Sequence, residues 1–159
     1  MNIKIGLGVD YHQLVEGRDL WIGGVQIPHS KGALGHSDAD VLLHAICDAL
    51  LGALALGDIG QHFPDTSAEF KGIDSKILLE RTYRLISEAG WEVGNIDATL
   101  SLEAPKTRPY VGAMQEVISQ ILHTPLDCIS VKATTAEKMG FVGREEGLMA
   151  QAVAILFKK

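Results

Sequence analysis

The feature that most constrains the fold of this chain is an irregular alternation of segments with strand character and segments with helical spacing. Four segments have the residue pattern of strands: 3–14, 96–102, 129–133 and 148–157. Three segments have the pattern of helices: from a cap at Ser37 or Asp38 to a stop at Gly57, 74–89 and 109–122. A Gly23-Gly24 pair indicates a hairpin or a bulge within residues 19–27. This order favours an α+β fold, an α/β sandwich with helices packed on a mixed β-sheet.

The length and charge of the chain exclude several classes of protein. A chain of 159 residues suits a single domain over residues 1–159, for which we expect a ferredoxin-like arrangement. The formal net charge of −6 leaves no basic footprint for a nucleic-acid partner. No apolar run reaches the roughly 18 residues of a membrane span, and no signal peptide precedes the first strand. We therefore expect a cytoplasmic protein, or one whose targeting peptide has been removed, with no membrane partner.

Acidic and imidazole side chains gather in the first third of the sequence. Asp10 and His12 are two apart on a strand and so point to the same face. Asp40, His44 and Asp48 fall four apart along the first expected helix and form one stripe. Asp10, His12 and His44 would make an N/O ligand set for Zn²⁺ with one position open, and Asp48 or Asp40 would then orient a ligand imidazole.

This spacing also fits a structural interpretation. His12 would then be a surface residue at the end of a strand, and His44 a hydrogen-bonded histidine where a helix meets the sheet. Two ligands on one strand with a remote third are less specific than paired CxxC motifs, so spacing alone leaves both interpretations open.

Two further segments have the chemistry of phosphate binding. His36 and Ser37 stand at the mouth of the first helix, where free N–H groups favour a phosphate, although the segment also fits a simple cap. After the third strand, Thr134 and Thr135 either cap a helical turn or donate hydrogen bonds to a phosphate, while Glu137 holds a hard cation such as Mg²⁺. The intervening loop of about a dozen residues, 60–72, is long enough for a binding role.

A series of motifs resembles, in order and over essentially the whole chain, the 2-C-methyl-D-erythritol 2,4-cyclodiphosphate synthase family. The motifs are Asp10-Tyr11-His12, Gly35-His36-Ser37-Asp38, Leu42-Leu43-His44-Ala45, residues 48–53, residues 57–60, residues 63–66, Glu103-Ala104-Pro105-Lys106, residues 132–138 and residues 140–144. The departures from the family pattern are Tyr11, Ala39, Val142 and Glu145. Ala39 and Glu145 stand where glycine is usual and put the local loop geometry in question, but none of the four removes an expected ligand.

The resemblance implies a phosphorus–oxygen lyase of the non-mevalonate isoprenoid precursor pathway. Its substrate, linked to cytidine diphosphate, is 4-diphosphocytidyl-2-C-methyl-D-erythritol 2-phosphate, which is closed to 2-C-methyl-D-erythritol 2,4-cyclodiphosphate with release of CMP. It further implies Zn²⁺ or another divalent cation at Asp10, His12 and His44, and Mg²⁺ or Mn²⁺ at Glu137 with the substrate diphosphate. His36 and Thr135 would stabilise the transition state.

The resemblance also implies the substrate contacts and the assembly. The substrate-binding residues would be Asp10, His12, His36, Ser37, Asp58, Ile59, Gly60, Phe63, Pro64, Asp65, Thr66, Ser67, Ala104, Pro105, Lys106, Arg108, Thr134, Thr135, Phe141 and Arg144. A homotrimer would place each active site between two subunits, and Phe141, Arg144 and Glu146 would line a central channel able to hold an isoprenoid diphosphate. By their residues alone, segments 104–106 and 140–144 fit ordinary turns equally well.

Two rival functions use the same residues. A metal-dependent nucleotide or phosphoester hydrolase would employ zinc-bound water as the nucleophile and yield a ring-open acid. A non-enzymatic module would bind metal or an isoprenoid diphosphate without turnover. The reaction product separates these alternatives from the synthase.

Overall fold

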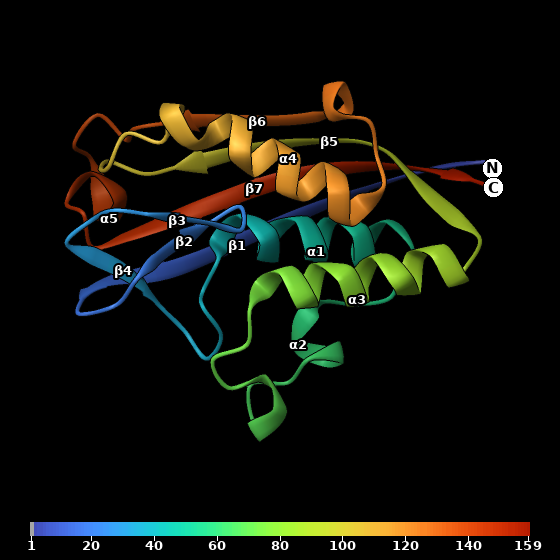
Figure 1. Cartoon of the computed structure of the whole chain (residues 1–159), viewed down its shortest axis with the longest axis horizontal. Helices are drawn as coiled ribbons and strands as arrows, with labels where there is room; N and C mark the ends of the chain where they lie inside the picture. The colour runs from blue at the N-terminus through green and yellow to red at the C-terminus, as the bar shows by residue number, and fades with distance from the viewer. Residues whose placement is uncertain (1) are drawn as a thin grey trace.

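The structure, a computed structural model, describes residues 2–159. Its largest sheet is mixed and has five strands (Figure 1). The strand order is β4-β1-β7-β5-β6. The strands are β1 (Ile3–Glu16), β4 (Lys31–Leu34), β5 (Trp91–Ser101), β6 (Ile129–Thr134) and β7 (Gly147–Lys158). β5 and β6 are parallel, and the other neighbours are antiparallel. A separate hairpin, β2 (Leu20–Ile22) with β3 (Val25–Ile27), lies between β1 and β4 in the sequence.

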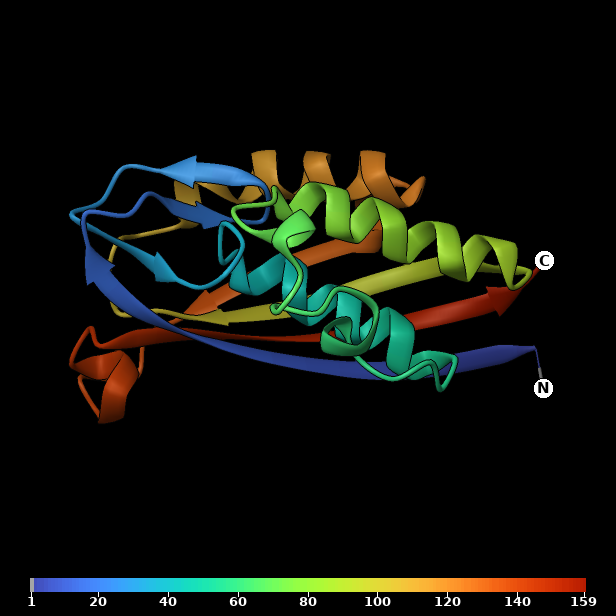
Figure 2. The same ribbon diagram turned by 90° about the horizontal axis from the view of Figure 1, so that it is seen from below.

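The long helices all cover one face of this sheet, as the two views at right angles show (Figures 1 and 2). They are α1 (Val41–Ala53), α3 (Ser75–Glu88) and α4 (Val111–Leu122). Short helices are α2 (Ile59–His62) and α5 (Gly140–Gly143), with 3₁₀ turns at Ala68–Phe70, Arg108–Tyr110 and Leu126–Cys128. The architecture confirms the expected α+β class with helices on a mixed sheet. Within residues 2–159, no helix combines the length and apolar character needed to cross a membrane.

Several observed elements differ from the prediction. The loop expected over residues 60–72 contains α2 and a 3₁₀ turn, and β4 was not predicted. β5 begins at Trp91, five residues before the predicted start at residue 96. The earlier start was not predicted because a register shift between Val93 and Asn95 interrupts the two-residue alternation. A bulge of this kind hides the start of a strand from a period-2 search.

The N-terminus of α1 is capped by Asp40, not by Ser37 or Asp38 as predicted, and the helix ends at Ala53 before reaching Gly57. The carboxylate of Asp40 accepts hydrogen bonds from the backbone N–H of Leu43 at 3.0 Å, of Gly23 at 2.9 Å and of Gly24 at 2.7 Å. Burial raises the pKa of this fully enclosed carboxyl. One side chain therefore starts α1 and fixes the β2–β3 turn against it.

Helix α1 lies directly on the backbone of β1, and two glycines make that contact possible. A Cβ atom on Gly6 would lie 1.8 Å from the carbonyl oxygen of Ala49, and one on Gly8 would lie 1.9 Å from that of Ala45. Real Cβ atoms do not approach so closely, so any side chain here would push α1 off the strand. The even-numbered residues of β1 thus face the helix.

The odd-numbered residues of β1 form the opposite, uncovered face of the sheet. Ile5 is 67% exposed and Leu7 63% exposed. Val153 and Phe157 of β7 pair with residues of this face and are exposed beside them. This face of the first strand is apolar, and it points away from the helices. A contiguous exposed apolar surface of this kind is typical of a protein–protein contact.

The β1–α1 contact yields a prediction about stability. We expect Gly8→Ala to lower the free energy of unfolding by about 1–3 kcal/mol or more, because the new methyl group overlaps backbone that cannot move aside. The measurement is urea-induced unfolding followed by circular dichroism. Gly112→Ala in α4 is the control: its Cβ would meet no atom of the described residues within 4 Å, so stability should stay the same or rise slightly. Equal stability of the two variants would contradict the interpretation.

Candidate functional site

The second half of β1 and the first turn of α1 bring three predicted ligands together. The Oδ2 atom of Asp10 lies 2.9 Å from Nε2 of His12 and 3.2 Å from Nδ1 of His44, and the two nitrogens are 3.2 Å apart. One donor atom from each side chain falls within 4.8 Å of the others. Asp10 and His12 face α1 because they continue the register of Gly6 and Gly8. His12 is not the strand-end surface residue of the alternative interpretation, because β1 continues to Glu16 and the His12 side chain is only 14% exposed.

The donor set suits a divalent cation. Two imidazole nitrogens and one carboxylate oxygen are the ligands of three-coordinate protein sites that leave a position open on zinc. Nδ1 of His12 donates to the carbonyl oxygen of Leu34 at 2.9 Å, so that Nε2, which faces Asp10, is the ring nitrogen available to a cation. Asp10, His12 and His44 thus form a potential metal-binding group at the meeting point of β1 and α1.

The electrostatics of the group favour bound positive charge. Burial raises the pKa of Asp10, but hydrogen bonds with His12 and His44 outweigh burial and lower the pKa to about 2. Burial lowers the pKa of His12, and its hydrogen bond with Asp10 reverses this, so that the net shift is upward. The carboxylate is therefore negative throughout the physiological range and sits between two nitrogen donors.

The acidic residues expected to orient a ligand imidazole have other partners. Asp40 caps α1, as described above, and Oδ1 of Asp48 accepts a hydrogen bond from the backbone N–H of Ile59 at 2.8 Å, which holds α2. Nε2 of His44 instead lies 3.2 Å from the hydroxyl of Ser37 and 2.9 Å from that of Ser75. Ser75 was missed in the sequence because it follows Asp74 at a helix start, where a serine indicates only capping.

A cavity of about 410 Å³ opens above the three ligands. Of the predicted site residues it is lined by Asp10, His12, His36, Ser37, His44, Ile59, Gly60, Phe63 and Asp65. His36 stands at the wall, with Nε2 3.2 Å from the carbonyl oxygen of Ser67, and Phe63 packs edge-on against Phe70. The segment predicted as a binding loop therefore contributes residues to the cavity. The cavity wall is apolar at Phe63 and Phe70 and polar at Asp10, His12 and His44. Asp58, Pro64, Thr66 and Ser67 lie in the same segment of chain but are not among the lining residues.

A second group of predicted residues gathers at the ends of β5 and β6. The backbone N–H of Leu102 donates to the carbonyl oxygen of Thr134 at 3.0 Å, and that of Ala136 donates to the Glu103 carboxylate at 3.1 Å. These contacts place Leu102 and Glu103, which directly precede the segment 104–108, beside Thr134 and Ala136. Nearby, Arg108 borders a cavity of about 420 Å³ with Val131 and Ala133. Glu137 is exposed just beyond, in a left-handed conformation with φ 52°.

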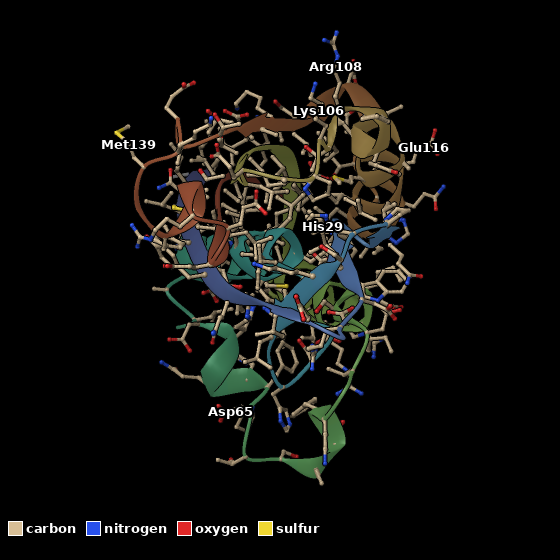
Figure 3. All side chains as sticks on the ribbon, turned by 90° about the vertical axis from the view of Figure 1, so that its left-hand side faces the viewer. His29, Asp65, Lys106, Arg108, Glu116 and Met139 are labelled. Atoms are coloured by element: carbon tan, nitrogen blue, oxygen red, sulfur yellow. The ribbon has the colours of Figure 1, made fainter. Side chains whose placement is uncertain are left out.

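The two groups lie apart within one chain. β7 and β5 separate β1 from β6 in the sheet, which at roughly 4.8 Å per strand is about 14 Å. Figure 3 shows the same division, with Asp65 at one end of the molecule and Lys106 and Arg108 at the other. The sequence spacing was compatible with both groups forming one site within a single chain. The strand order instead keeps the two groups apart.

A third group surrounds α5. The rings of Phe141 and Tyr11 pack together with their centroids 6.0 Å apart, and both residues border a cavity of about 340 Å³. Arg144 forms a bidentate pair with Glu146 at 2.9 and 3.1 Å, and this hydrogen bonding raises the pKa of the guanidinium and lowers that of the carboxyl. Segment 140–143, for which a turn was the alternative, is a short helix.

Two departures from the family pattern prove to be conformational. Ala39 has φ 58° and Glu145 has φ 56°, both in the left-handed region that glycine enters at no steric cost. Each loop thus keeps a backbone shape suited to glycine although the residue is not glycine.

Comparison with known proteins gives one consistent result. A sequence profile of the YgbB family matches residues 3–157. The chain is 57% identical over 156 residues to the 2-C-methyl-D-erythritol 2,4-cyclodiphosphate synthase of Bacteroides fragilis, covering 98% of each chain, and 58% identical over 153 residues to that of Porphyromonas gingivalis, covering 96% and 94%.

Solved structures agree with these sequence matches. A 2C-methyl-D-erythritol-2,4-cyclodiphosphate synthase in a CDP-bound form superimposes with TM-score 0.88 at 38% identity, over 96% of this chain and 99% of that one. The bifunctional IspDF from Campylobacter jejuni superimposes with TM-score 0.95 at 43% identity. That match covers 99% of this chain and 42% of the bifunctional protein.

The three-residue group predicts a specific loss of metal binding. We expect His44→Ala to abolish stoichiometric Zn²⁺ binding while the far-ultraviolet circular dichroism stays that of the folded protein, because the imidazole supplies one of three donors. Metal content after dialysis against trace zinc is the measurement. His123→Ala, at an exposed histidine after α4, is the matched control and should bind zinc normally. Full zinc content in His44→Ala would show that the cation is held elsewhere.

Proposed function

The chain belongs to the YgbB family, and we propose that the site described above carries out the reaction of that family's cyclodiphosphate synthases. The chain is a phosphorus–oxygen lyase of the non-mevalonate isoprenoid pathway. It converts 4-diphosphocytidyl-2-C-methyl-D-erythritol 2-phosphate to 2-C-methyl-D-erythritol 2,4-cyclodiphosphate and releases CMP. The observation that supports the assignment to this site is the Asp10, His12 and His44 group at the base of a cavity.

The reaction requires positioning more than covalent help. An oxygen of the 2-phosphate forms a bond to the β-phosphorus, and the bond from that phosphorus to the bridging oxygen breaks, so that CMP leaves with the electron pair. The nucleophile is already an anion, and no general base is needed. The rate therefore depends on holding the two phosphates in line and on neutralising the charge that spreads over their oxygens.

We propose zinc as the cation at Asp10, His12 and His44, because two imidazoles and a carboxylate match its preferences. Bound there, the cation supplies positive charge that polarises a phosphate oxygen. Glu137 is proposed to hold Mg²⁺ or Mn²⁺ together with the substrate diphosphate, as an exposed carboxylate suited to a hard cation. The remaining chemistry belongs to hydrogen-bond donors: His36 at the cavity wall and Thr135 at the second group are proposed to stabilise the transition state.

The two groups of site residues are proposed to hold opposite ends of one substrate. The cavity residues and the loop segments 58–60 and 63–67 would receive the erythritol phosphate. Segment 104–108, with Thr134 and Thr135, would receive the cytidine, a role supported by the cavity beside Arg108. Residues 1–159 would act as one domain in this scheme.

We propose a homotrimer in which each active site joins the metal-binding group of one subunit to the second group of its neighbour. The separation of about 14 Å within a chain supports sharing, and the uncovered apolar face of β1 and β7 supplies a surface for contact. Phe141 and Arg144 would line a central channel for an isoprenoid diphosphate. The pairing of Arg144 with Glu146 would reduce the repulsion among three copies of the arginine around an axis.

The reaction product tests the function directly. We expect ³¹P NMR of the purified protein with the cytidyl substrate to show a cyclic diphosphate and CMP in equal amounts, and a chelator to stop turnover until a divalent cation is restored. A ring-open phosphate product would instead identify a hydrolase. Metal binding without turnover would identify a binding module.

Mixed oligomers test the shared site. We expect homotrimers of His44→Ala and of Glu137→Gln each to have little activity at limiting Mg²⁺, because each lacks one group at every site. Subunit exchange between the two variants should restore activity, since each mixed trimer contains an intact site built from a wild-type His44 and a neighbour's wild-type Glu137. Mass photometry checks that trimers form. No recovery in confirmed mixed trimers, or a fully active monomer, would refute the shared site.

A further inference from the structure

We propose that Ser75 is a positioning residue for His44: its hydroxyl, held by Asp38, determines which ring nitrogen of His44 is free to bind a cation. Ser75 is the first residue of α3 and is fully buried, 31 residues from His44 in the sequence. The inference deepens the proposed metal site and rests on it. It adds a residue that neither the sequence pattern nor the motif resemblance singled out.

Asp38 holds Ser75 in a fixed orientation from two sides. The backbone N–H of Ser75 donates to Oδ2 of Asp38 at 3.0 Å, and the Ser75 hydroxyl donates to Oδ1 of the same carboxylate. Asp38 also accepts a hydrogen bond from the backbone N–H of Asp40 at 3.2 Å, so it is tied to the start of α1. The hydroxyl is thereby fixed between the N-termini of α1 and α3.

Counting protons then determines the tautomer of His44. A serine hydroxyl has one proton, and that of Ser75 is used toward Asp38, which as a carboxylate can only accept. Toward Nε2 of His44, 2.9 Å away, the Ser75 oxygen can therefore only accept, and Nε2 must carry the hydrogen. Nδ1 is therefore the ring nitrogen that a cation can take, and it faces Asp10 at 3.2 Å.

The two ligand histidines are thus set in opposite tautomers by different acceptors. His12 uses Nδ1 to donate to a backbone carbonyl and presents Nε2, whereas His44 uses Nε2 to donate to Ser75 and presents Nδ1. A backbone carbonyl can only accept a hydrogen bond. The Ser75 hydroxyl acts as an acceptor toward His44 because it donates its own hydrogen to the Asp38 carboxylate. Partners of this kind typically alter metal affinity by about 10–100-fold when removed.

Ser37 is the competing candidate for the same role. Its hydroxyl lies 3.2 Å from Nε2 of His44 and accepts from the backbone N–H of Ala39 at 3.0 Å. Among the hydrogen bonds of residues 2–159, the proton of Ser37 has no acceptor of its own other than His44. Ser37 could therefore donate or accept, and it does not by itself select a tautomer.

The test is the Zn²⁺ dissociation constant, measured by competition with a chromophoric chelator on the purified metal-free protein. We expect Ser75→Ala to weaken binding by about 10–100-fold, and Ser75→Thr, which keeps the hydroxyl, to restore much of the affinity. Thr82→Val is the matched control, because it removes another fully buried hydroxyl of α3 that has no hydrogen-bond partner among the described residues. It should bind zinc as the wild type does. Should Ser75→Ala fail to fold, Ser75→Gly tests the same hydroxyl.

A spectroscopic measurement separates positioning from general destabilisation. In the zinc-loaded wild type, ¹⁵N-resolved imidazole NMR should show a slowly exchanging Nε2–H on His44, and its exchange should accelerate in Ser75→Ala but not in Thr82→Val. Unchanged zinc affinity in Ser75→Ala would overturn the proposal, as would an equal loss in Thr82→Val. Loss in Ser37→Ala alone would transfer the role to Ser37. Failure of the wild type to bind zinc would instead reject the proposed metal site itself.

Discussion

The contact between α1 and β1 is the constraint on which the rest of the structure depends. With no side chains at Gly6 and Gly8, the helix lies against the strand backbone at a distance that any Cβ would prevent. The same face of β1 continues into Asp10 and His12, and His44 is the neighbour of Ala45, whose carbonyl meets Gly8. The closeness of the helix is therefore what places an imidazole of α1 within 3.2 Å of a carboxylate on β1. The close packing of α1 on β1 and the arrangement of the three ligand side chains therefore depend on the same contact.

A buried polar junction supplements this packing where three elements begin. Asp40 joins α1 to the β2–β3 turn, while Asp38 joins the start of α1 to Ser75 at the start of α3. Hydrogen bonds are most consequential in such places, because a buried carboxylate without partners would cost several kcal/mol. The junction stabilises the fold and at the same time orients His44. An alteration in it would therefore reach the metal-binding group without touching a ligand.

The sheet distributes the site residues over its two ends and leaves one face uncovered. Helices α1, α3 and α4 cover one side, so the alternate residues of β1 and β7 present isoleucine, leucine, valine and phenylalanine to the other. The same strand order places β5 two strands and β6 three strands from β1, which carries Asp10 and His12, or about 10 Å and 14 Å between strands. An uncovered apolar face and a divided site are both features that association of identical chains would resolve. The geometry of one subunit thus makes assembly part of the proposed function.

The sequence by itself determined the strands and helices with a clear period and the shared face of Asp10 and His12, but its spacing left the pairing of these two residues with His44 open. What it determined follows from local geometry, because side chains two apart on a strand or four apart on a helix share a face in any fold. It did not determine the bulged start of β5, the cap at Asp40 or the acceptor for His44. Asp48 had the helical spacing for that last role, but it binds the backbone of Ile59, and Ser75 is the acceptor. Such choices depend on which elements meet through space, as α1 and α3 do. Strand order likewise has no local signature, so only the tertiary structure separated the two groups of predicted site residues.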